Sequence, residues 1–178
     1  MKRILIAGCP GSGTAFTAKT FARFCPSSHE WKANLPESGG PPYTVVVGYN
    51  AWRDAKAAVT DDDALVLQVR HPVDNIASMS GIASGDSMFA ELGGPKNLQN
   101  SSLLSRMRLW LNYNCEYTKR ACLTFHVEDM PDPFGLRGLN THKDKRGYQL
   151  TAWSEMYDTD HVLAVGIEEL ARELGYGN

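Results

Sequence analysis

The sequence predicts a three-layer α/β fold with a central, mainly parallel sheet of about four to five strands. Short apolar runs alternate with segments of helical periodicity, which is typical of strand–helix–strand units with right-handed crossovers. A glycine-rich turn follows the first apolar run, as in a strand that leads directly into a helix. The 178 residues suffice for one core, so we expect a single domain over residues 1–178.

Four apolar runs account for the strands of this sheet. Each run is short and almost continuously apolar, as expected for a parallel strand that is buried on both faces. The runs are Ile4–Ala7, Thr44–Val47, Leu65–Val69 and Leu123–Val127.

Helical patterns lie between and after these runs. A helix over Thr14–Phe24 follows the first strand, and one over Ala51–Val59 follows the second, with Asn50 as its N-cap. Pro72 suits the first turn of a third helix, because proline lacks the N–H that a helix start leaves unused.

Two further helices are predicted nearer the C-terminus. The longer one runs from Ser102 to about Cys122 and has one apolar face. The last helix is capped by Asp160 and stops near Gly175. Its apolar stripe consists of Leu163, Ile167, Leu170 and Leu174.

Three stretches have the composition of long loops: Pro26–Tyr43, Gly81–Asn100 and Pro131–Gly147. Long loops in a compact domain are usually functional. In an open α/β sheet, the loops at the carboxyl ends of the strands form the binding crevice.

The amino-acid composition and net charge argue against several classes of protein function. The net charge of −2 argues against a protein that coats nucleic acid, and no apolar stretch approaches the length of a membrane span. No signal peptide is visible, because Met1 is followed at once by a strand pattern. The four cysteines lack C-x-x-C spacing, which favours reduced thiols and a cytoplasmic location.

The turn after the first strand predicts an anion site. Consecutive N–H groups and a helix N-terminus favour a phosphate here. The spacing of Gly8 and Gly13 partly matches an NTP-binding loop, but Thr14 stands where that motif carries its lysine. The alternative is a glycine-rich turn that binds no ligand.

The segment from Arg70 to Ser78 predicts a second anion site. A guanidinium at a strand end and a hydroxyl in the next helix can converge on one phosphate. One alternative is an ion pair between Arg70 and Asp74, and another is a Ser78 hydroxyl bonded to its own helical turn. If one ligand touches both sites, the strand before Arg70 lies beside the strand before Gly8.

Together the two segments resemble the P-loop sulfotransferases. That family carries a P-[KR]-S-G-T loop and a later R-x-P-x-D-x-x-x-S segment. This chain has Pro10-Gly11-Ser12-Gly13-Thr14 and Arg70-x-Pro72-x-Asp74-x-x-x-Ser78. The second segment matches closely, whereas Gly11 replaces the lysine or arginine of the first. The resemblance implies a P-loop NTPase-like version of the α/β fold.

The resemblance also implies the donor and the residues that hold it. The donor is 3′-phosphoadenosine 5′-phosphosulfate (PAPS), the product is 3′,5′-diphosphoadenosine (PAP), and no metal is required. The implied donor-binding residues are Pro10, Gly11, Ser12, Gly13, Thr14 and Ala15 for the 5′-phosphosulfate, with Arg70, Ser78, Lys145, Arg146 and Gly147 for the 3′-phosphate.

The expected reaction moves a sulfuryl group to a hydroxyl or amine of a small-molecule or carbohydrate acceptor. Glu30 is the first candidate for the base and His29 the second, while Arg146 can supply the cation that Gly11 cannot. A lysine at Gly11 would raise the rate if the φ angle there is negative. The alternatives are a catalytically impaired nucleotide-binding protein and an NTP-dependent small-molecule kinase.

Overall fold

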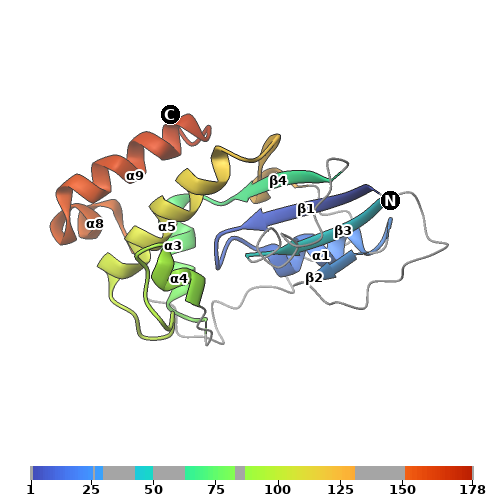
Figure 1. Cartoon of the computed structure of the whole chain (residues 1–178). Helices are drawn as coiled ribbons and strands as arrows, with labels where there is room; N and C mark the ends of the chain where they lie inside the picture. The colour runs from blue at the N-terminus through green and yellow to red at the C-terminus, as the bar shows by residue number, and fades with distance from the viewer. Residues whose placement is uncertain are drawn as a thin grey trace.

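The computed structural model describes residues 2–25, 27–29, 43–49, 63–82, 87–130 and 151–177. Its strands form one five-stranded parallel sheet in the order β2-β3-β1-β4-β5 (Figure 1). The strand bounds are β1 Lys2–Gly8, β2 Ser27–His29, β3 Tyr43–Gly48, β4 Ala64–Val69 and β5 Leu123–His126. The predicted α/β class and parallel sheet are confirmed.

The helices follow the strands in the predicted alternation. Their bounds are α1 Thr14–Phe21, α3 Pro72–Met79, α4 Ser87–Glu91, α5 Leu103–Thr118, α8 Trp153–Thr159 and α9 His161–Glu173, with a short 3₁₀ turn η1 at Val127–Asp129. No helix in the described part of the chain is both long and apolar enough to cross a membrane.

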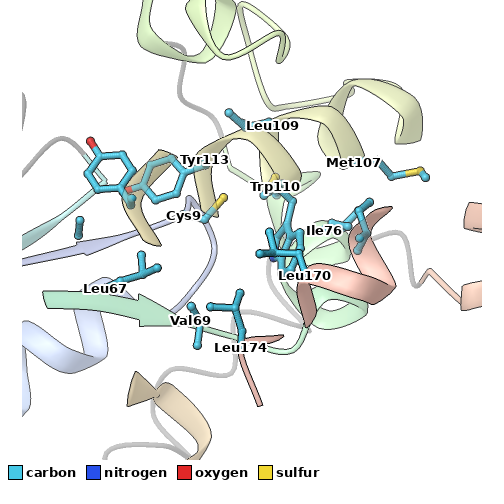
Figure 2. Packing of buried hydrophobic residues seen from close by; sticks show 14 of the residues in the cluster. Cys9, Leu67, Val69, Ile76, Met107, Leu109, Trp110, Tyr113, Leu170 and Leu174 are labelled. Carbon is cyan, nitrogen blue, oxygen red and sulfur yellow. The ribbon is translucent and has the colours of Figure 1, made fainter. Parts of the chain in front are cut away.

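One face of the sheet carries the larger part of the core. Side chains such as Leu5 of β1 and Leu67 of β4 point to this face, where α3, α5, α8 and α9 supply the covering residues. Figure 2 shows Trp110 of α5 together with Ile76 of α3 and Leu170 of α9. These large side chains are buried, so they remove much apolar surface from water.

The opposite face is covered by α1. Ile6, Val47 and Val66 point away from the first face and cluster with Ala18 of α1. Alternate residues of each central strand are therefore buried on opposite faces, which explains why the strands have almost continuously apolar sequences. The two helical layers and the sheet give the three predicted layers.

The end signals of α9 are confirmed. The Asp160 carboxylate accepts a hydrogen bond from Leu163 N at 3.0 Å, which satisfies one of the free N–H groups of the helix start. Gly175 follows the helix with φ 91°, the left-handed conformation common at helix ends.

The structure corrects two predicted loops. Strand β2 lies within Pro26–Tyr43, and helix α4 lies within Gly81–Asn100. The sequence of β2 is short and polar, so only its pairing with β3 identifies it as a strand. Helix α4 has five residues and is held by burial of Met88 and Phe89. The predicted helix at 51–59 and its Asn50 cap lie outside the described residues.

Candidate functional site

The sheet has its topological switch point between β1 and β4. These strands are parallel neighbours, with Gly8 opposite Gln68. The chain leaves β1 for α1 on one face and leaves β4 for α3 on the other. In open α/β sheets, ligands bind at the carboxyl ends of such diverging strands. The predicted adjacency of the strands that precede Gly8 and Arg70 is confirmed.

The loop between β1 and α1 has the backbone of an anion-binding turn. Ser12 N donates to Cys9 O at 2.9 Å, which closes the turn. Gly11 has φ 83° and Gly13 has φ 93°, while Ser12 between them keeps the ordinary negative φ. Such alternation turns successive N–H groups toward one concave side. Gly13 caps α1 without a side chain, so this helix end also faces the loop with backbone N–H groups.

Three side chains from the β4–α3 segment hold three successive carbonyl oxygens of this loop. Asn75 Nδ2 donates to Pro10 O at 2.6 Å, Arg70 Nη1 to Gly11 O at 2.9 Å, and Gln68 Nε2 to Ser12 O at 2.7 Å. Gln68 and Asn75 are buried, so these bonds form away from bulk water. The carbonyl groups are therefore fixed toward β4 and α3.

Ser78 of α3 lies against the same loop. A Cβ placed on Gly11 would come within 3.2 Å of Ser78 Oγ and 3.1 Å of Asn75 Nδ2. Within the described residues the Ser78 hydroxyl makes no hydrogen bond back to its own helical turn, and Arg70 forms no ion pair with Asp74, which is exposed. The structure thus brings Arg70, Ser78 and residues 10–15 together. This is the arrangement expected of a shared site and not of either alternative, since the alternatives bond Arg70 and Ser78 only within their own segment.

Buried polar atoms without partners surround the loop. Among the described residues, Ser12 Oγ, Gln68 Oε1 and Asn75 Oδ1 have no hydrogen-bond partner. Buried polar atoms in proteins are nearly always satisfied by protein, water or ligand. The two amide oxygens can accept only from a hydrogen-bond donor, whereas the Ser12 hydroxyl can also donate to an anion.

The geometry at Gly11 does not meet the condition of a negative φ under which a lysine is expected to raise the rate. A side chain at this position would point toward Asn75 and Ser78 on α3, not into open space beside the loop. Because φ is positive, any L-residue is also strained here. A lysine at position 11 is therefore a poor replacement for the cation of the sulfotransferase loop.

The remaining predicted site residues are only partly described. His29 ends β2, at the same edge of the sheet as Gly8, but its side chain is not described. Glu30, Lys145, Arg146 and Gly147 lie outside the described residues.

Sequence reasoning missed Gln68 and Asn75. Gln68 is the one polar residue in an apolar strand, which is a signal for a buried hydrogen bond. Asn75 follows the conspicuous Asp74 but, unlike Asp74, is buried. Both amides contribute to the site by holding the loop.

The neighbouring Cys9 has no catalytic character. Its thiol is fully buried, and burial raises its pKa well above the usual value. It therefore remains a neutral thiol that packs in the core.

Comparison with models of known protein families and with curated proteins gave no match. The described residues contain no cluster of three or more histidine, cysteine or acidic side chains suited to a metal ion.

The left-handed conformation of Gly11 gives a direct stability test. Gly11→Ala should lower the free energy of unfolding by about 1–2 kcal/mol, because it puts a side chain on a left-handed residue against α3. The matched control is Gly166→Ala in α9, where the new methyl would lie 3.5 Å from Leu111 Cδ2. That change should stabilise the protein by about 0.5–1 kcal/mol, because alanine favours the helix. Urea denaturation measures both, and an unchanged stability of Gly11→Ala would contradict the described loop.

Proposed function

We propose that the protein is a sulfotransferase that uses PAPS, with a P-loop NTPase-like fold. The observation that carries the proposal is the contact of Arg70 and Ser78 with one glycine loop at the switch point of the sheet. The R-x-P-x-D-x-x-x-S spacing of that segment supports the choice of a donor with a 3′-phosphate.

The two halves of the site suit a ligand with anions at both ends. The N–H groups of Gly11 and of residues 13–15 bind the 5′-phosphosulfate, because the carbonyls of Pro10, Gly11 and Ser12 are held on the other side by Asn75, Arg70 and Gln68. Arg70 uses one of its five N–H donors on Gly11 O, which leaves others for a phosphate. Ser78 Oγ adds a hydroxyl to this second anion site.

In the proposed reaction the acceptor oxygen or nitrogen bonds to sulfur while the bond from sulfur to the bridging phosphate oxygen breaks. The acceptor proton passes to a base, for which Glu30 and then His29 remain the candidates. The loop stabilises the charge on the departing 3′,5′-diphosphoadenosine. A cation on the bridging oxygen must come from elsewhere than position 11, and Arg146 and Lys145 are the candidates.

Two alternatives make different predictions. A small-molecule kinase would use the loop for ATP, but the sequence lacks the lysine that contacts the terminal phosphates, and such a kinase assigns no role to Arg70 and Ser78. A catalytically impaired protein would still bind the donor but would not transfer the sulfuryl group. The observation that supports this alternative is the glycine at position 11.

Donor specificity is tested by binding. We expect 3′,5′-diphosphoadenosine to bind more tightly and to raise the melting temperature more than 5′-AMP or ATP. Arg70→Ala should remove most of that preference, since a charge-assisted hydrogen bond contributes about 1.5–3 kcal/mol. Arg108→Ala, on the exposed face of α5, is the matched control and should preserve it. Equal stabilisation by 5′-AMP and 3′,5′-diphosphoadenosine would rule out the proposed 3′-phosphate site.

Turnover is tested with PAPS that carries a radiolabelled sulfuryl group and with a panel of hydroxyl and amine acceptors. We expect weak but measurable transfer or PAPS hydrolysis, because loss of one transition-state donor typically costs about 10²–10³ in rate. Arg146→Ala or Lys145→Ala should abolish it, whereas Lys96→Ala, at an exposed position, should not. High wild-type activity untouched by either loop variant would show that the cation lies elsewhere. Donor binding without any transfer would favour the impaired protein.

A further inference from the structure

The segment after α9 returns to the carboxyl ends of β4 and β5. Leu174 packs in the core, and Leu174 O accepts a hydrogen bond from His126 Nε2 at 2.6 Å. The chain then turns at Gly175, and Tyr176 N donates to Ala171 O at 2.9 Å. These bonds place the Tyr176 side chain beside the end of β5.

Tyr176 is joined to the residue after Arg70 through one carboxylate. The Tyr176 hydroxyl donates to Glu128 Oε2 at 3.0 Å, and Glu128 Oε1 accepts from His71 N at 2.9 Å. The His71 N–H belongs to the peptide plane that contains the Arg70 carbonyl. Its bond to Glu128 therefore restrains the ψ angle of Arg70.

Ring contacts support the same arrangement. The Tyr176 ring meets the His71 ring edge-on, with centroids 5.5 Å apart, and lies 4.4 Å from the His126 ring. Burial and the Glu128 carboxylate raise the pKa of Tyr176 well above its usual value, while the charge of Arg70 lowers it. The hydroxyl therefore stays protonated as a donor, and the Arg70 guanidinium lies within electrostatic range of it.

We infer that Tyr176 is a positioning residue of the anion site, which orients Arg70 through Glu128 and His71. Arg70 is then held at two points: its guanidinium by Gly11 O and its backbone by the Glu128 carboxylate. The inference rests on the proposed function, in which Arg70 binds the 3′-phosphate of the donor. It adds the C-terminal segment and the end of β5 to the segments in which the sequence located the site.

The test compares the dissociation constants of 3′,5′-diphosphoadenosine and 5′-AMP by calorimetry. Their ratio isolates the contribution of the 3′-phosphate. Tyr176→Phe keeps the ring and removes the hydroxyl, and it should reduce the ratio by about three- to tenfold while 5′-AMP binding stays unchanged. Glu128→Ala removes both acceptor oxygens, so neither Tyr176 nor His71 N–H keeps its partner, and it should reduce the ratio at least as much.

Tyr157→Phe is the matched control. Tyr157 donates to Glu168, so this variant also breaks a tyrosine–glutamate hydrogen bond, but one that joins α8 to α9. It should leave the ratio at the wild-type value even if it lowers the melting temperature as much as Tyr176→Phe does. A merely structural role of Tyr176 predicts equal ratios in the two variants.

The outcomes separate the two proposals. If the wild-type protein prefers 3′,5′-diphosphoadenosine and both Tyr176→Phe and Glu128→Ala keep that preference, the positioning role is wrong and the proposed function stands. If the wild-type protein shows no preference, the proposed 3′-phosphate site is wrong, and the positioning role is rejected with it.

Discussion

The site depends on three hydrogen bonds that tie the loop after β1 to the segment after β4. Gln68, Arg70 and Asn75 each donate to one of three successive loop carbonyls. Two of these donors are buried amides, and breaking such a bond leaves a polar group unsatisfied at a cost of about 1–3 kcal/mol. The carbonyls are held toward β4 and α3, and Ser12 N–H is bonded to Cys9 O, so the N–H groups of Gly11 and Gly13 are the ones that we propose for an anion. The bonds thus fix one loop conformation, in which Gly11 and Gly13 have a positive φ that glycine adopts without steric penalty.

The same bonds connect the two proposed anion sites. Arg70 holds Gly11 O with one N–H and is itself the main cation that the described part of the site offers to a phosphate. A ligand that binds the Arg70 guanidinium therefore also affects the loop to which Arg70 is hydrogen-bonded. Parallel pairing of β1 with β4 makes this possible, because it brings the ends of both strands to the switch point of the sheet. The sulfotransferase proposal needs that coupling, since one donor molecule must contact both sites.

Part of the fold and part of the candidate site could be predicted from the sequence. The remaining strands and site residues could not, for physical reasons. The central strands were found because burial on both faces requires nearly continuous apolar residues, whereas the polar Ser-Ser-His of β2 carries no such signal. Arg70 and Ser78 were found because their spacing is distinctive. Gln68 and Asn75 were not, because a buried amide shows which carbonyl it meets only when the fold is known. Tyr176 and Glu128 are 48 residues apart, so no local pattern joins them.

The central claim is that one ligand engages the glycine loop and Arg70 together. A ¹H–¹⁵N NMR titration with 3′,5′-diphosphoadenosine tests it most directly, by following the Gly11 and Gly13 amides and the Arg70 side-chain Nε–H in the same samples. We predict that all three signals shift and that they saturate with a single dissociation constant. Signals of the loop and of Arg70 that saturate with different constants, or a response of only one of the two groups, would contradict the claim.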